Sequence, residues 1–362
     1  MIRWRDGVVT AQGRQWPGAA ELEVTQADGS TCRALAYPAL TGLPQPGDRV
    51  LLNTTALAQG LGTGGYAFVV AVPGRLPPDP PPSGHLVKAR YTPLQATVQG
   101  ADEQGSPHHE LLRDADDLGA MPVIIADLHS ALPAVLAAAR QAQQPDPPRA
   151  VYVMQDGGTL PAWFSRTCAA LREAGWLAGT VSVGQSFGGD LEAVTLHTGL
   201  LAARLVLGAD LAVVAQGPGN LGTGTRWGFS GVACGEAVNA AAVLNGRPVA
   251  SLRVSDADAR QRHQGISHHS LTAYGRVALA RADVPVPELP GALGALVQEQ
   301  AAPLAQRHNL VSVPVDGLQE ALRACPVKLS TMGRGLDQDL AYFLAAAAAG
   351  RHAAALLQPG AG

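Results

Sequence analysis

The stretch MPVIIADLHS, residues 121–130, shows the pattern that decides the fold. A short apolar run ends at Ala126, the polar residues Asp127 and His129 follow, and a helical pattern begins at Ser130. Further apolar strands, most of them followed by a helical pattern, occur at AVYVM (150–154), GTVSVG (179–184), LAVVA (211–215), PVASLRV (248–254) and LVSVPV (310–315). Apolar strands that alternate with helices predict an α/β fold with a mainly parallel sheet flanked by helices.

The residues before this region follow a different pattern. Short runs rich in β-branched residues, such as AELEVTQ (20–26) and YAFVVAV (66–72), are separated by turn residues. They predict that residues 1–72 form a small all-β module, a barrel or a sandwich. Residues 73–84 are rich in proline, which predicts a stiff linker. The α/β domain is then expected over residues 85–362.

The composition is that of a water-soluble globular protein. Of the 362 residues, 47% are hydrophobic and 15% are charged, and the net charge is −3. This balance gives no basic surface for nucleic acid or for an anionic membrane, and charged residues interrupt the longest apolar runs. The four cysteines are far apart in sequence, and the N-terminus has no apolar signal core. A cytoplasmic protein is therefore expected, without nucleic-acid or membrane partners.

Polar residues follow each strand of the predicted sheet at its carboxyl end. Asp127 and His129 follow the first strand, Asp156 the second, and Asp256 the strand that ends at Val254. In open parallel sheets, ligands bind outside the carboxyl ends of the strands. The working site is therefore predicted at this edge of the sheet.

The loop from Gln216 to Gly231 is too long for a simple connection. Its start matches the dinucleotide pattern G-x-G-x-x-G, but further glycines delay the helix, no acidic residue ends a strand about 20 residues later, and the lysine of a P-loop is lacking. The loop is instead predicted to bind an anion through backbone N–H groups and polar side chains. The residues assigned to this role, together with Asp156, are Gly217, Gly219, Gly222, Thr223, Gly224, Thr225 and Arg226. The alternative is a flexible loop that covers a helix end.

The segment RQRHQGISHHS, residues 260–270, holds three of the ten histidines. Ser267 is predicted to cap a helix, which puts His268 and His269 in its first turn, where the helix dipole favours neutral imidazole. Neutral imidazole can ligate a metal or act as a base. Asp256 or Asp127 would complete a mixed site for zinc, manganese or iron. Adjacent helical residues diverge by about 100°, so the two histidines need not share one target, and surface hydrogen bonding is the alternative.

Two other segments carry hypotheses. GQSFG (184–188) matches the nucleophile pattern G-x-S-x-G, so a hydrolase that uses Ser186 with Asp256 and His268 or His269 is an alternative. Asp190 is expected to cap a long helix that reaches residue 208, with His197 packed in the core. The alanine-rich segment 340–357 is expected in the core or in a dimer contact, so a homodimer is possible.

Five segments resemble a family of bacterial proteins known only as domain-of-unknown-function family 3866. They are GHLVKARYTPLQ (84–95), YVMQDGGTLP (152–161), residues 184–210, GPGNLGTGTRWGFSG (217–231) and RHQGISHH (262–269). The resemblance covers most of the chain and implies a bacterial cytoplasmic protein, but it implies no activity.

The leading hypothesis is an enzyme that acts on a small anionic metabolite. Acid–base groups or ligands for a divalent metal would come from Asp127, His129, Asp256, His268 and His269, with Asp256, His268 and His269 as the metal ligands. A non-catalytic protein that binds or senses a small ligand is the alternative, and neither the substrate nor the role of the N-terminal module follows from the sequence.

Overall fold

The computed structural model describes residues 1–62, 64–81 and 83–358. Pro82 of the predicted linker and residues 359–362 of the predicted α/β domain lie outside these ranges. The chain forms two compact units. The first comprises Met1–Ser83, Ala89–Gln95 and Trp163–Ala169, and the second comprises Gly84–Lys88, Ala96–Ala162 and Ala170–Gly362.

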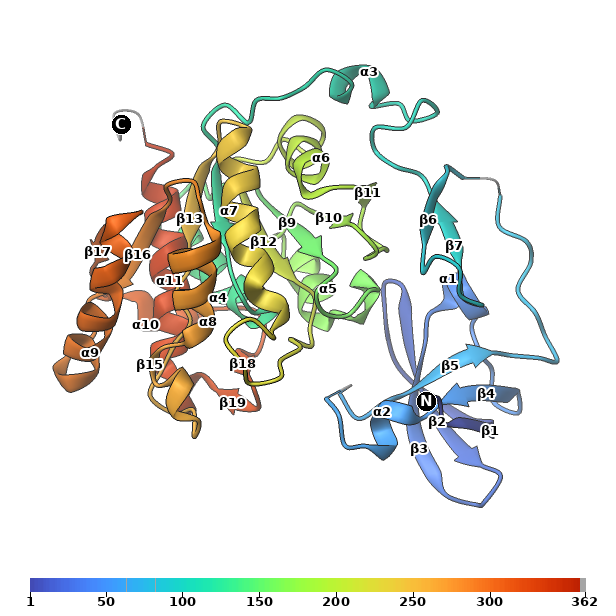
Figure 1. The fold of residues 1–362 in the computed structure, drawn as a ribbon. Coiled ribbons are helices and arrows are strands. Elements are labelled where there is room, and N and C mark those ends of the chain that lie inside the picture. The colour runs from blue at the N-terminus through green and yellow to red at the C-terminus, as the bar shows by residue number, and fades with distance from the viewer. Residues whose placement is uncertain (63, 82, 359–362) are drawn as a thin grey trace. The chain divides into compact units, whose positions relative to one another are not determined.

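The first unit contains a closed five-stranded β-barrel (Figure 1), which confirms the predicted barrel-like module. Its strands, in the order β1-β2-β3-β5-β4, are β1 (Trp4–Trp16), β2 (Ala19–Gln26), β3 (Thr31–Ala36), β5 (Ala67–Ala71) and β4 (Arg49–Asn53). Two short helices, α1 (Pro38–Thr41) and α2 (Thr55–Ala58), connect them. Alternate residues such as Leu22 and Val24 of β2 point inward and are buried, as the period of two in a strand requires. A second apolar cluster joins Tyr37 and Phe68 to Trp163.

The second unit is built on an eight-stranded parallel sheet, as the sequence predicts. Its order is β11 (Leu191–Ala193), β10 (Gly179–Val183), β9 (Ala150–Gln155), β12 (Leu211–Gln216), β8 (Pro122–Ile125), β13 (Arg247–Ala250), β16 (Asp283–Pro287) and β17 (Asn309–Val313). Three two-stranded ribbons accompany it: β6 (Leu86–Lys88) with β7 (Ala96–Val98), β14 (Val254–Ser255) with β15 (Gly265–Ile266), and β18 (Ser330–Thr331) with β19 (Arg334–Gly335). Strand β16 was not predicted, because Pro285 and Pro287 discourage a strand assignment.

Helices cover both faces of this sheet (Figure 1). The helices that follow the barrel in the chain are α3 (His109–Leu112), α4 (Leu132–Ala142), α5 (Arg166–Glu173), α6 (Leu196–Leu201), α7 (Ala233–Val243), α8 (His268–Thr272), α9 (Gly291–Ala301), α10 (Leu318–Arg323) and α11 (Leu340–Ala355). Of these, α6, α7, α9 and α11 contact the strands of the sheet. Helix α11 packs against α4 and is largely buried, so the alanine-rich segment belongs to the core. Gly350 makes this close packing possible, because a Cβ there would lie 2.1 Å from the carbonyl oxygen of Val135.

The predicted long helix from Asp190 is wrong in its first half. Strand β11 occupies Leu191–Ala193, and α6 begins only after its cap Thr195. Asp190 does not cap a helix: it accepts hydrogen bonds from the backbone N–H and the hydroxyl of Thr180, at 2.8 and 3.0 Å. The physical reason is that residues 191–193 pair in parallel with β10, which outweighs their local helical pattern. His197 is exposed rather than packed in the core.

None of the described helices is both long enough and apolar enough to cross a bilayer.

The order of the strands creates a topological switch. From β8 the chain runs to β9, β10 and β11 on one side, returns to insert β12 between β9 and β8, and then extends on the other side through β13. Ligands of open α/β sheets bind at such a reversal, outside the carboxyl ends of the strands. The loops that leave β8, β12 and β13 therefore meet where a site is expected.

Candidate functional site

Three histidines converge at the switch point. The possible ligand nitrogens of His263, His268 and His269 all lie within 4.8 Å of one another. We call these residues the three-histidine cluster. His268 and His269 occupy the first turn of α8, and the side chain of Ser267 accepts a hydrogen bond from the backbone N–H of His269, which confirms the predicted cap. The two neighbouring rings lie together, with centroids 4.4 Å apart.

A short β-ribbon brings His263 to the start of this helix. Val254 of β14 pairs with Ile266 of β15, so the loop between the two strands folds back beside α8. Gly265 has a φ of +65°, a left-handed conformation that glycine adopts without strain. His263 Nδ1 then hydrogen-bonds with Ser267 Oγ at 2.7 Å. This bond fixes the ring and leaves Nε2 available to a ligand.

Asp127, which follows β8, orients His269. Oδ2 of Asp127 lies 2.9 Å from His269 Nδ1. Because an ionised carboxylate can only accept, Nδ1 carries the proton and Nε2 presents its lone pair. The imidazole also stacks on Phe229, with ring centroids 3.8 Å apart and an angle of 5°. Carboxylates that hold a metal-ligating histidine in one tautomer are a regular feature of metal sites.

The Asp127 carboxylate is itself buried and paired. Its burial raises the pKa, but the hydrogen bond from His269 and the charge of Arg253 outweigh burial and hold the pKa below the ordinary value. Asn220 Nδ2 donates to Oδ1 at 2.9 Å, and Arg253 donates to Oδ2 at 3.2 Å. Gly231 leaves space for the carboxylate, since a Cβ there would lie 1.8 Å from Oδ1. Asp127 is thus held as an anion behind the cluster.

Two members of the cluster are neutral at pH 7. Burial, followed by the charges of Arg253 and Arg260, lowers the pKa of His263 to about 3. Burial, followed by His269 and Arg262, lowers the pKa of His268 to about 4. His268 Nε2 is buried and has no hydrogen-bond partner among the described residues. A buried nitrogen without a partner is costly, which suits an atom that ligates a metal.

A small pocket lies beside the cluster. Its volume is about 110 Å³. Three arginines, two histidines, Met332 and the start of the glycine-rich loop line it: Asn220, Leu221, Gly222, Gly224, Arg253, Arg260, Arg262, His263, His269 and Met332. The pocket therefore joins the cluster to a cationic wall.

Two residues of the predicted catalytic set lie elsewhere. Asp256 is exposed and is not part of the group that could hold a metal, whose third member is His263. The acid of this loop that turns inward is Asp258, which Arg260 binds through two hydrogen bonds of 2.9 and 2.8 Å. His129 is buried, and its Nδ1 hydrogen-bonds with the hydroxyl of Tyr152 at 3.1 Å. Its burial lowers the pKa to about 4, and it does not belong to the cluster.

Many polar groups of the glycine-rich loop form hydrogen bonds within the loop itself. Residues 222 and 229 form a bridge of a small hairpin, and the Thr223 backbone N–H donates to the carbonyl of Gly228 at 2.7 Å. The hydroxyls of Thr223 and Thr225 lie 3.2 Å apart and contact the same glycine. A Cβ on Gly217 would lie 2.8 Å from the carbonyl oxygen of Thr159, so this glycine lets the backbone pass close to the loop that follows β9.

Only Gly222 and Gly224 of the predicted anion-binding set line the pocket. Gly219, with a φ of +100°, has open space around it, and Arg226 is exposed. Asp156 accepts a hydrogen bond from the backbone N–H of Gln185 at 2.8 Å. It therefore holds the turn after β10.

Ser186 lies in the core with no exposed surface. Its hydroxyl donates to the carbonyls of Met154 and Val183, at 2.9 and 2.7 Å. The hydrolase alternative requires a histidine within hydrogen-bond reach, and the hydrogen bonds of the described residues include none between Ser186 and a histidine. The geometry gives this nucleophile no support.

Arginines and one acid were not predicted for the site. Arg253, Asp258, Arg260 and Arg262 stand within one short segment, and the alternation of opposite charges in RVSDADARQR was a usable signal. Which of its two acids turns inward depends on distant partners such as Arg334, 3.5 Å from Asp258. That choice is not visible in the sequence.

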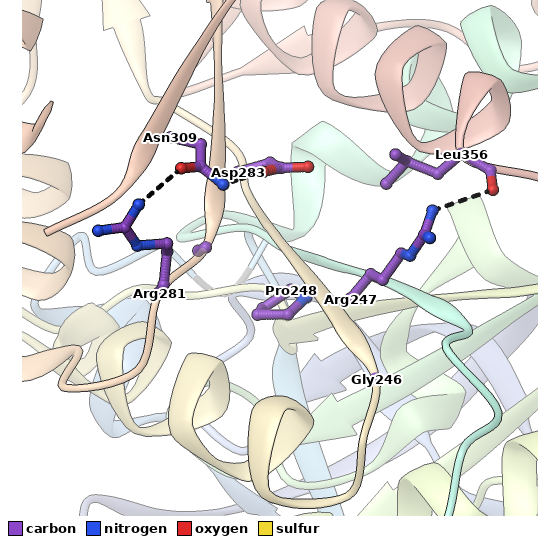
Figure 2. Close-up of a pocket in the computed structure, with 8 residues that line it drawn as sticks. Gly246, Arg247, Pro248, Arg281, Asp283, Asn309 and Leu356 are labelled. Carbon is purple, nitrogen blue, oxygen red and sulfur yellow. Dashed lines mark hydrogen bonds between the residues drawn. The ribbon is translucent and has the colours of Figure 1, made fainter. Parts of the chain in front are cut away.

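Another pocket, of about 350 Å³, lies at the amino ends of β13, β16 and β17 (Figure 2). Arg281 donates to Asn309, which in turn donates to Asp283, at 3.1 and 3.0 Å. Arg247 donates to the carbonyl of Leu356 at 3.4 Å. The polar groups drawn in Figure 2 thus bind one another. They lie where strands β13, β16 and β17 begin, whereas the three-histidine cluster follows the carboxyl end of β13.

Comparison with known proteins gives a family but no activity. No curated protein and no solved structure matches the chain. A family model described as a protein of unknown function, DUF3866, matches residues 33–350, from the barrel strand β3 into the last helix α11. This match confirms the resemblance found in the sequence, and the chain belongs to the DUF3866 family.

Proposed function

We propose that this protein is a divalent-metal-dependent enzyme that acts on a small anion. The observation that carries the proposal is the convergence of His263, His268 and His269 within 4.8 Å beside a pocket lined by arginines. Three further observations support the proposal. Low pKa values keep His263 and His268 neutral, and the buried Nε2 of His268 has no hydrogen-bond partner among the described residues. The carboxylate of Asp127 orients His269.

The donor set narrows the choice of metal. Imidazole ligands suit zinc, iron, copper and nickel, whereas manganese and magnesium prefer oxygen ligands. Of the three metals expected from the sequence, zinc and iron fit better than manganese. Catalytic zinc sites commonly have three protein ligands and keep the fourth position for water or substrate. The three-histidine cluster matches that count.

Hydrolysis is the chemistry that such a site supports best. A metal held by His263, His268 and His269 would lower the pKa of water to about 7 and so supply a nucleophile at neutral pH. In hydrolysis the water oxygen would bond to the phosphorus or carbon of the substrate, the bond to the leaving group would break, and the leaving group would take up the proton that the water loses.

The test is metal content. Protein purified without a histidine tag is reconstituted with zinc or iron, desalted and analysed by inductively coupled plasma mass spectrometry. We expect about one metal per chain, lost in His268→Ala and retained in His197→Ala, an exposed histidine on α6. Circular dichroism checks that both variants fold. Wild-type protein that binds no metal after reconstitution, or equal loss in both variants, would contradict the proposal.

A metal-free enzyme is the second candidate, favoured by the hydrogen bond between His269 and Asp127. Such a pair can serve as a general base. It predicts turnover that survives chelation and the His268→Ala substitution. Metal-dependent release of nitrophenolate from p-nitrophenyl phosphate or p-nitrophenyl acetate separates the two candidates, since chelator abolishes it only for the metal enzyme.

A further inference from the structure

The charges around the pocket can be followed group by group. Asp258 binds Arg260 and lies 3.7 Å from Arg253 and 3.5 Å from Arg334. Arg253 also forms an ion pair with Asp127, at 3.2 Å. Three of the arginines are thus engaged with acids that are themselves buried.

Asp339 completes this network. It is fully buried and accepts hydrogen bonds from Arg334 at 2.9 Å and from the Ser255 hydroxyl at 3.0 Å. Asp127, Asp258 and Asp339 are therefore all paired with arginines of this network. Three carboxylates balance three arginines, and none of the three acids is left to neutralise a further cation at the pocket.

Arg262 is that further cation. It lines the pocket, its side chain is exposed, and no ion pair or hydrogen bond involves it among the described residues. Its guanidinium lies beside the glycine-rich loop, with Nη2 3.7 Å from the place that a Cβ on Gly224 would occupy. Arg262 also faces the cluster, since its charge acts on His268. Its N–H donors are available to a ligand that enters the pocket.

We propose that the pocket binds the phosphate group of a phosphate monoester, with Arg262 as the residue that recognises it. The proposal rests on the proposed metal site. A divalent ion beside Arg262 gives the site three positive charges that its own acids do not balance. A phosphate monoester carries nearly two negative charges at pH 7 and three acceptor oxygens, whereas a carboxylate carries one charge and two. A planar guanidinium binds phosphate through two parallel hydrogen bonds.

The size of the pocket fits this assignment. A volume of about 110 Å³ is well below the ~300 Å³ or more of pockets that enclose whole drug-sized ligands. It accommodates a charged head group, and the remainder of the substrate extends outside. Met332, which is exposed at the rim of the pocket, offers an apolar contact to that remainder.

The experiment measures binding of inorganic phosphate and of acetate by isothermal titration calorimetry, at equal ionic strength, to the metal-reconstituted full-length protein. Arg262→Ala is compared with Arg276→Ala, which removes an exposed arginine that does not line the pocket. We expect phosphate to bind more tightly than acetate. Arg262→Ala weakens phosphate binding ten- to a hundred-fold, as the loss of a charged hydrogen bond does, and Arg276→Ala leaves it within two-fold.

The metal content of the same samples separates this inference from the proposed function. Two results at normal metal content overturn the phosphate site alone. One is a phosphate affinity that is equal in wild type and both variants, and the other is a phosphate affinity no tighter than the acetate affinity. Absence of metal contradicts the metal-dependent function, and the same titrations on metal-free protein then decide whether Arg262 still governs phosphate binding. An Arg262→Ala effect there upholds the anion site, and no effect overturns it.

Discussion

Replacing Asp127 by asparagine tests the orientation of the three-histidine cluster. Asparagine keeps the shape that Gly231 accommodates, and its amide oxygen still accepts from Asn220. Its NH₂ group takes the place of Oδ2, where it faces His269 Nδ1. The imidazole then accepts at Nδ1 and carries its proton on Nε2, so that this nitrogen no longer offers a lone pair to a metal.

The expected magnitude has two parts. Loss of a carboxylate that orients a metal-ligating histidine lowers metal affinity about 10- to 100-fold, or about 1.4 to 2.7 kcal/mol. The buried Arg253 also loses its partner at 3.2 Å. Breaking a buried ion pair costs about 3–5 kcal/mol, and the lower end is expected because Asp258 remains 3.7 Å away.

Competition against a fluorescent zinc chelator measures the metal affinity, and urea unfolding of the metal-free protein measures the stability. Asp256→Asn is the matched control: the residue is an exposed acid outside the cluster, so its stability and metal affinity should stay within about 0.5 kcal/mol of wild type. A folded Asp127→Asn protein with wild-type metal affinity would refute the orienting role. Loss of metal in Asp256→Asn would restore Asp256 as a ligand.

Three further outcomes are expected. Gly231→Ala puts a Cβ 1.8 Å from Asp127 Oδ1, so it should lower the free energy of urea unfolding by about 1–3 kcal/mol and also weaken metal binding. Gly74→Ala should leave the stability unchanged, because there is open space around Gly74. Ser186→Ala should lose about 0.5–1.5 kcal/mol of stability and keep its metal and its activity, and a folded but inactive variant would revive the serine hydrolase. Burial lowers the pKa of His129 to about 4, so between pH 6.5 and 4 the unfolded chain binds a proton that the folded protein does not. Wild type should therefore lose about 3 kcal/mol from this residue as the pH falls through that window, and His129→Gln should flatten the pH series by that amount.

The position of the paired histidines was predictable, because local chemistry decides it. Ser267 caps α8 through its own hydroxyl, so the placement of His268 and His269 in the first turn follows from a few neighbouring residues. The edge of the sheet was predictable because polar loops leave the carboxyl ends of parallel strands. The long helix from Asp190 failed because pairing of residues 191–193 with β10 is not a local property.

The sequence by itself determined the parallel sheet, the β-module before it and the edge at which the polar residues gather, because strand and helix periodicity, turn residues and caps act over a few positions. Only the tertiary structure decided which residues share the site. His263 joins the cluster because β14 pairs with β15, and Asp127 reaches His269 across 142 positions of sequence. Asp258 turns inward and Asp256 outward because the arginines that compensate a buried carboxylate stand on one side of the loop. A buried charge needs its partners in space, and the sequence does not show where they lie.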